Sequence, residues 1–279
     1  MVPSLGRRTF IASGAAVGAA MVLRPGAAHA ALPVVNMEMA LLAAQRDPVK
    51  PDEAVTPGAG PSVTLVEDAL VAQGLLASQY VDGHFGTVTR TAYIKWQKSL
   101  GYTGLAANGL PGKASLAALG AQRFSVTRPV SIGARTTLQG FPFNTRTVAM
   151  LNKAKQLSGA ALVVEQGSYS PGEDPTSAGT HDGGGAVDID AEALTSGQRT
   201  ALVTALRQVG FAAWLRLPSE GDWPMHIHGI AVNDTDLSPS AQKQVGQYYL
   251  GLNGLANNGP DNGPKVTKVT WEDYLRAHA

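Results

Sequence analysis

The feature that most constrains the fold is a short alternating segment behind a run of three glycines. Residues 186–190 have the sequence Ala-Val-Asp-Ile-Asp, so apolar and acidic side chains alternate. Because successive side chains of a β-strand point to opposite faces, this pattern predicts a half-buried strand whose apolar side faces a core. Gly183, Gly184 and Gly185 have no Cβ, so the backbone before the strand can adopt positive φ and fold His181 back over the strand start.

A second alternating segment, His226-Ile227-His228, occurs later in the chain. The same period of two predicts that Ile227 faces a core and that both imidazoles emerge on the opposite face. If the two strands pair, Asp188 and the two histidines share one open surface. Two or three neutral imidazoles and one carboxylate suit Zn²⁺, because catalytic zinc sites use three protein ligands and keep a fourth position for water.

Two further observations bear on this metal hypothesis. The chain contains no cysteine, which excludes a cysteine-rich structural zinc site and any disulfide. The plainer alternative is a set of polar side chains on a loop and an edge strand that make ordinary hydrogen bonds. A single histidine would favour that alternative, whereas the glycine-rich loop, the strand carboxylate and the alternating histidine pair together favour a metal.

The first thirty residues have the pattern of an export signal. Arg7 and Arg8 precede an apolar segment at 10–23, and an Ala-x-Ala site ends at Ala30, after which we expect cleavage. Residues 1–30 resemble the signal peptides of the bacterial twin-arginine pathway, which exports folded proteins. The resemblance implies a secreted or cell-wall-associated protein that can load its metal before export. The apolar segment is too short and too weakly hydrophobic for a stable membrane span, with a retained anchor as the alternative.

The charge balance argues against nucleic acid as a partner. The chain has 22 Lys and Arg residues and 21 Asp and Glu residues, which gives a formal charge of +1. Arg7, Arg8 and Arg24 belong to the leader, and removing these three leaves 19 basic residues against 21 acidic ones. A mature chain with a charge of −2 lacks the polycationic character that phosphate backbones select. We expect a monomer.

The chain between the leader and residue 120 divides into a linker and a helical unit. Residues 31–61 have a short helical pattern at 35–45, then four prolines and two glycines, which predict an extended tether. Residues 62–120 have apolar spacing typical of three helices, with turns at 82–86 and 108–112 that each contain an Asp-Gly or Asn-Gly pair. The predicted helices are residues 66–76, 87–100 and 113–119.

Residues 62–120 resemble the type 1 family of peptidoglycan-binding domains. The resemblance lies in VDGHFGTVT at 81–89, AYIKWQ at 92–97 and NGLPGKASLAAL at 108–119. It implies a small three-helix domain whose partner is peptidoglycan. The alternative is a helical spacer without a ligand.

Residues 121–256 predict a separate α+β domain with a mixed or antiparallel sheet. Strand patterns alternate with helix patterns, and Thr195 or Ser196 caps one helix that ends at Gly210. The predicted helices are residues 145–157, 195–209 and 238–250, and the predicted strands are 162–166, 186–190, 211–215 and 225–232. Residues 140–144 are expected to form a loop. Residues 257–279 form a C-terminal tail in which 271–279 can dock as a short helix.

The two alternating segments resemble the zinc D-alanyl-D-alanine carboxypeptidase superfamily, which includes peptidoglycan endopeptidases and the hedgehog signalling domain. The resemblance covers roughly 140–232, on SAGTHDGGGAVDID at 177–190 and HIHGI at 226–230, and favours a mostly antiparallel sheet. It implies that His181, Asp188 and His228 bind zinc. It also places His226 beside the metal as a hydrogen-bonding or electrostatic helper, and Asp222 where hedgehog-like members carry the carboxylate that handles the proton.

The resemblance implies a multidomain, secreted, zinc-dependent peptidase that acts on peptidoglycan as a D,D-carboxypeptidase or an endopeptidase. Four alternatives stay open at this point. The His-x-His pair could bind the metal with both rings and leave Asp188 outside the ligand set, and Glu220 competes with Asp222 for the role of base. Ser170 stands where the carboxypeptidases usually carry an arginine, with Gln166 or Tyr169 as possible substitutes. The missing arginine supports the alternative of a catalytically inactive peptidoglycan-binding protein with a structural or vestigial zinc site.

Overall fold

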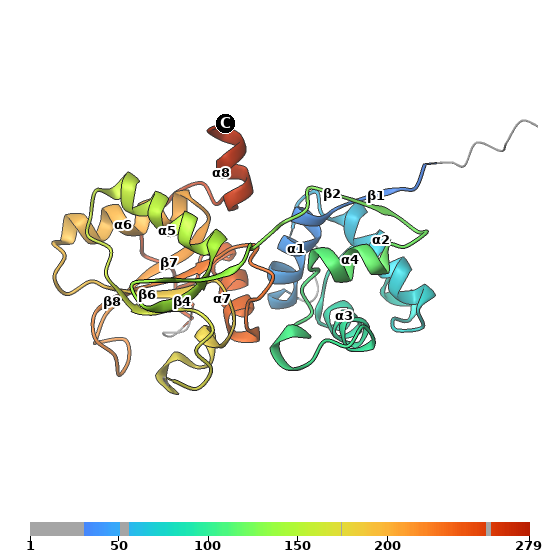
Figure 1. The fold of residues 1–279 in the computed structure, drawn as a ribbon, viewed down its shortest axis with the longest axis horizontal. Helices are drawn as coiled ribbons and strands as arrows, with labels where there is room; N and C mark the ends of the chain where they lie inside the picture. The colour runs from blue at the N-terminus through green and yellow to red at the C-terminus, as the bar shows by residue number, and fades with distance from the viewer. Residues whose placement is uncertain (1–30, 51–55, 174, 255–257) are drawn as a thin grey trace, which may run out of the picture. The chain divides into compact units, whose positions relative to one another are not determined.

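A four-stranded antiparallel sheet carries both alternating segments (Figure 1). The computed structural model describes residues 31–50, 56–173, 175–254 and 258–279, so the expected leader at 1–30 lies outside it. The strand order is β5-β6-β8-β7, and every neighbouring pair is antiparallel. The strands are β5 (Val164–Gln166), β6 (Ala186–Asp190), β7 (Phe211–Arg216) and β8 (His226–Ala231).

Helices α5 (Thr145–Ser158) and α6 (Ser196–Gln208) cover one face of this sheet. The apolar side chains of the alternating segments, Val187, Ile189 and Ile227, are fully buried against them in one hydrophobic cluster. Asn144 caps the start of α5, and Thr195 and Gln198 form a capping box at the start of α6. The prediction of an α+β arrangement with a half-buried 186–190 strand is confirmed.

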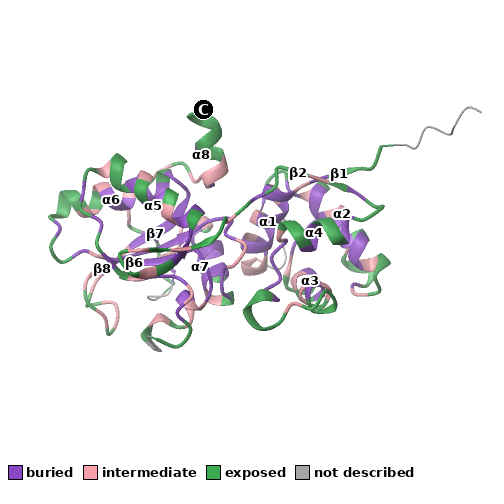
Figure 2. Ribbon diagram, in the orientation of Figure 1, coloured by how far each residue is buried: buried purple, intermediate pink, exposed green. Residues whose placement is uncertain are grey.

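The opposite face of the sheet changes character along its strands. At one end Ala186, Ala212 and Ile230 lie in register and are buried beneath α7 (Pro239–Tyr249). Two residues further along each strand, the next row on this face is Asp188, His228 and Trp214. The row after that is Asp190, His226 and Arg216. The cluster under α7 continues into the N-terminal helices, and residues Leu32–Ala279 form one compact unit. Figure 2 shows buried segments both in these helices and in the strands of the sheet. The expected multidomain layout and its boundaries stay a prediction.

The helical unit contains α2 (Gly60–Ala72), α3 (Thr87–Ser99) and α4 (Lys113–Leu119). The two later helices agree with the sequence-based expectation. Helix α2 begins six residues before the predicted start, because Pro61 occupies the first turn, where a missing N–H removes no hydrogen bond.

The linker expected at 31–61 begins with a strand and with the short helix predicted there, and both are packed into the fold. Val34–Asn36 forms β1, which pairs in parallel with β2 (Ser125–Thr127), and Met37–Arg46 forms α1. Leu41 and Ala44 of α1 are fully buried, and α1 packs against α2 and α7. The side chain of Asn36 caps the helix, and the apolar stripe of α1 fills the core of the helical unit. The short helix expected within this segment is confirmed.

The expected loop at 140–144 is instead a strand. Phe141–Asn144 forms β4, which pairs with β3 (Arg135–Leu138) in a hairpin. Both turn residues have positive φ, 54° at Gln139 and 89° at Gly140, which is the twist that two-residue hairpin turns require. Pro142 is tolerated because β4 is an edge strand of a two-stranded ribbon.

The C-terminal tail ends in a docked helix, α8 (Trp271–Ala277). A capping box of Thr270 and Asp273 starts the helix, and Glu272 forms an ion pair with the buried Arg146. Arg276 binds Glu38 of α1 through both terminal guanidinium nitrogens. In the part of the chain that is described, every helix is too short or too polar to span a membrane.

Glu67 of α2 holds the Asp-Gly turn of the helical unit. One carboxylate oxygen accepts the backbone N–H groups of Asp82 and Gly83, and the other accepts the hydroxyl of Thr89. Gly83 has φ of +79°, which only glycine adopts without strain, so the carboxylate and the glycine together fix the turn. Glu67 is fully buried, and burial raises its pKa from the ordinary value of 4.5 to about 7.

We expect Glu67 to make the stability of the protein depend on pH. Because its pKa is higher in the folded than in the unfolded chain, its contribution is fully present below about 4.5 and is lost as the pH rises towards 7. The free energy of unfolding of Glu67→Gln should therefore improve relative to wild type across this window, by roughly 3 kcal/mol. Urea unfolding at several pH values measures it, with Asp68→Asn on the exposed side of α2 as control. Parallel pH profiles for Glu67→Gln and wild type would contradict the assignment.

Candidate metal centre

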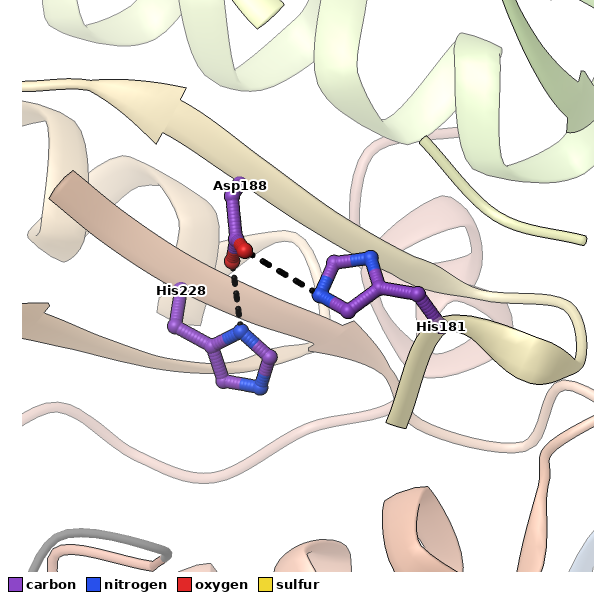
Figure 3. Close-up of side chains that lie close together, drawn as sticks. All are labelled: His181, Asp188 and His228. Carbon is purple, nitrogen blue, oxygen red and sulfur yellow. Dashed lines mark hydrogen bonds and ion pairs between the residues drawn. The ribbon is translucent and has the colours of Figure 1, made fainter. Parts of the chain in front are cut away.

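Three side chains from three separate segments converge on the polar face of the sheet (Figure 3). His228 Nδ1 lies 2.6 Å from Asp188 Oδ1, and His181 Nε2 lies 3.2 Å from Asp188 Oδ2. The three ligand atoms lie within 4.8 Å of one another, and both histidines are buried while Asp188 is half-buried. This group, which we call the His-Asp-His group, could hold a metal ion.

The register of the sheet places two members of the group. Asp188 is directly opposite His228 in the β6–β8 pair, so both side chains emerge on the same face. The third member, His181, lies on the short helical turn Thr180–Asp182. The glycine run behind it packs against residues 234–238, where a Cβ on Gly183 would collide with the backbone at Asp236 and Ser238. The close backbone approach that we expected of these glycines is therefore an approach to residues 234–238. It turns the chain so that His181 lies next to strand β6.

Each imidazole has a fixed partner on its far side. His181 Nδ1 lies 2.8 Å from the carbonyl oxygen of Gly167, and His228 Nε2 lies 3.0 Å from Gln244 Oε1. Gln244 is oriented by Thr180, because its amide nitrogen lies 2.8 Å from the Thr180 hydroxyl. Both far-side partners are acceptors, so both rings carry their proton on the far nitrogen when neutral.

The protonation states of these three side chains suit the binding of a cation. Burial lowers the pKa of His228 to about 4, which keeps that ring neutral at neutral pH. Burial alone would raise the pKa of Asp188, but in acid the charge and hydrogen bonds of the protonated His228 and His181 outweigh burial and hold that pKa far below its usual range, so Asp188 is ionised at neutral pH. Two imidazole lone pairs and an ionised carboxylate therefore face one another, and a divalent cation satisfies all three. The residues fit Zn²⁺ by donor type and by their outer hydrogen bonds.

The group lies in the wall of a cavity of about 570 Å³. His226 and Asp222, the two residues that the sequence suggested for chemistry, also border this cavity. Glu165 and Glu173 border it as well. Burial raises the pKa of Glu165, and the carboxylates of Asp190 and Asp188 act in the same direction. The described lining of the cavity therefore combines three histidines with the carboxylates of Glu165, Glu173 and Asp222, which are largely exposed.

His226 lies beside the His-Asp-His group and outside it. Its Nδ1 lies 2.9 Å from the carbonyl oxygen of Pro224, and its Nε2 lies 3.8 Å from Asp188 Oδ1. The carbonyl fixes the proton on Nδ1, so the neutral ring presents a lone pair at Nε2. Among the described residues the candidate ligands are one histidine of the His-x-His pair, His181 and Asp188, which disfavours the alternative with both rings on the metal.

The two competing carboxylates of the 217–225 turn have different surroundings. Glu220 Oε2 accepts the backbone N–H of Leu217 and borders a second cavity on the other side of the turn. Asp222 is exposed and borders the cavity of the His-Asp-His group. The geometry favours Asp222 over Glu220 as a group that meets a ligand there.

Three residues lie at or near the position where the carboxypeptidases usually carry an arginine. Two of them support the fold, and one borders the cavity. Ser170 is buried, and its backbone N–H donates to the carbonyl oxygen of His181, so it supports the loop. Tyr169 donates to Asp236 and lies under the guanidinium of Arg135, which makes it part of the scaffold. Gln166 borders the cavity, and its buried amide nitrogen has no hydrogen-bond partner among the described residues.

Comparison with known proteins adds nothing to this geometry, since neither a family model nor a curated protein nor a solved structure matches the chain. Sequence reasoning missed Gln244, Glu165 and Arg216. Nothing in the spacing of α7 marks Gln244. Arg216 directly follows the strand predicted at 211–215, and extending that strand by one residue would have placed it on the face of His226.

We expect the metal-free protein to bind one Zn²⁺ or Co²⁺ per chain at neutral pH. His181→Ala should lower the affinity by roughly 100-fold or more, because one of three ligands is lost. His226→Ala is the matched control and should keep the stoichiometry, since its ring lies outside the group. Isothermal titration measures both. Unchanged affinity in His181→Ala would contradict the assignment.

The same titration tests the outer hydrogen bonds. Gln244→Leu removes the acceptor that fixes the His228 proton on Nε2, so we expect the metal affinity to fall roughly 10- to 100-fold, with the stoichiometry unchanged. Lys243→Met, an exposed neighbour on α7, is the control. If Gln244→Leu binds metal as tightly as wild type, Gln244 does not position the ring.

Proposed function

We propose that this chain is a secreted zinc-dependent peptidase that acts on the peptides of peptidoglycan, as a D,D-carboxypeptidase or an endopeptidase. The observation that carries the proposal is the His-Asp-His group in the wall of a cavity that Asp222 and His226 also border. His181, Asp188 and His228 would hold the zinc. When bound, zinc supplies Lewis-acid polarisation of a carbonyl and lowers the pKa of a water.

The side chains of the cavity suit the proton transfers of peptide hydrolysis. Asp222, exposed at the rim, accepts the proton of the attacking water and passes it to the leaving amine. Glu165, whose pKa burial raises, is a second carboxylate suited to carry that proton. His226 donates Nδ1–H to Pro224, so its Nε2 donates to a developing oxyanion only when the ring is protonated.

The helical unit would hold the enzyme at its substrate. The resemblance of residues 62–120 to peptidoglycan-binding domains supports this role, and tethering raises the local concentration of cleavable peptides. Export through the twin-arginine pathway would let the folded chain carry its metal out of the cell. We propose a secreted or cell-wall-associated monomer.

The second candidate is a peptidoglycan-binding protein without catalysis. It is favoured by one observation, the burial of Ser170 in the loop where the carboxypeptidases are expected to carry an arginine. In that case the metal would hold the 177–185 loop against β6 and β8 and have no reaction to promote.

Digestion of purified peptidoglycan by the zinc-loaded protein separates the two candidates. We expect released peptides from wild type, and a loss of kcat of roughly 10²- to 10⁴-fold in Asp222→Ala, because a proton-transfer group is removed. Zinc content should be unchanged in that variant. Glu220→Gln is the matched control from the same turn, and Glu165→Gln tests the competing carboxylate.

The outcomes are distinct. Zinc-loaded wild type that binds sacculi and releases nothing would favour the silent binder. Cleavage by Asp222→Ala at the wild-type rate, with a loss in Glu165→Gln, would move the proton-transfer role to Glu165.

A further inference from the structure

Three arginines among the described residues are buried, and two of them have carboxylate partners. Arg146 binds Glu272, and Arg207 binds Asp261. Arg216 is only 3% exposed, and no described carboxylate lies within ion-pair distance of it. Its Nη1 donates to the carbonyl oxygen of Asn253, and its Nη2 is buried without a hydrogen-bond partner.

A buried guanidinium without a counter-ion is costly, because it has lost the hydration of a charge. Burial lowers the pKa of Arg216 to about 10, which still leaves the side chain charged at neutral pH. The face of Trp214, 5.0 Å from the guanidinium carbon, compensates in part through a cation–π contact. Glu220, Asp188 and Asp261 also stabilise the charge, each from beyond ion-pair distance, so the site has room for an anion that contacts the guanidinium.

Arg216 lies where a ligand of the His-Asp-His cavity would meet it. It is directly opposite His226 on the sheet, in the row next to that of Asp188 and His228, and it borders the same cavity. Adjacent rows on one face of a strand lie about 7 Å apart. Among the described residues that border the cavity, Glu165, Glu173 and Asp222 are carboxylates outside the His-Asp-His group, and carboxylates repel an anion. Arg216 is therefore the one lysine or arginine among the described residues that border this cavity.

We propose that Arg216 binds the carboxylate of the substrate, so that the cavity takes peptides with a free C-terminal carboxylate close to the cleaved bond. This inference rests on the proposed peptidase function and decides between its two forms in favour of a carboxypeptidase. The free hydrogens of Nη1 and Nη2 match the two oxygens of a planar carboxylate. Arg216 would make this contact without an arginine at position 170, where this chain has a serine.

Binding of a short peptide in acid and amide forms tests the proposal. The zinc-loaded Asp222→Ala protein is titrated with N-acetyl-D-alanyl-D-alanine and with its C-terminal amide, so that turnover does not interfere. We expect the acid to bind roughly 10- to 100-fold more tightly than the amide, the size of a hydrogen bond to a charged group. Adding Arg216→Gln should abolish that preference, and Arg216→Lys should keep part of it.

Arg199→Gln is the matched control, because Arg199 borders the second cavity that Arg216 also borders, and not the first. Circular dichroism and thermal unfolding check that each variant folds. Equal binding of acid and amide, no binding of the acid, or an acid preference that survives Arg216→Gln each overturns the proposal. An acid preference that depends on Arg216, in a protein whose wild type releases nothing from peptidoglycan, supports the carboxylate site and counts against the proposed peptidase.

Discussion

The pairing of Asp188 with His228 across β6 and β8 is the contact on which the site depends. A shift of one residue in this register would turn either side chain to the opposite face. The register is held from behind the sheet, where Val187, Ile189 and Ile227 are fully buried beneath α5 and α6. Burying three such side chains stabilises the pairing by roughly 5 kcal/mol or more. The hydrophobic core on one face thus forces the polar groups together on the other.

Helix α7 links that sheet face to the rest of the chain. Its apolar side covers the row of Ala186, Ala212 and Ile230, and Gln244 on the same helix holds the far nitrogen of His228. Helix α1, from the segment expected to be a linker, also packs against α7. The proposed metal ligands and the N-terminal helices therefore share one structural support.

Alternation predicted the most from sequence. In 186–190 and 226–228 one face is buried and the other is polar, so the pattern gave both the strands and the face on which Asp188 and His228 lie. Strand β7 has no such pattern, because Ala212 and Ala213 are buried on opposite faces, and Arg216 was missed there. Helix α1 was expected within its segment, but its burial depends on contacts with α7, distant in sequence.

The sequence did not predict the hairpin of β3 and β4, and the reason is local. Pro142 argues against a strand, and Gln139-Gly140 is not the usual Asn-Gly or Asp-Gly turn. The role of Gln244 was not predicted, because a glutamine on a helix does not indicate from its sequence position that it will contact His228. The features that the sequence did not predict are contacts between segments that are distant in sequence, because these contacts depend on the tertiary structure.

The central claim is that one cation satisfies His181, Asp188 and His228 together. X-ray absorption at the zinc edge, on protein loaded with one equivalent of zinc, tests it most directly. We predict a shell of nitrogen and oxygen atoms at about 2.0–2.1 Å with the scattering of two imidazoles. A shell with three or more imidazoles, or with no imidazole at all, would contradict it.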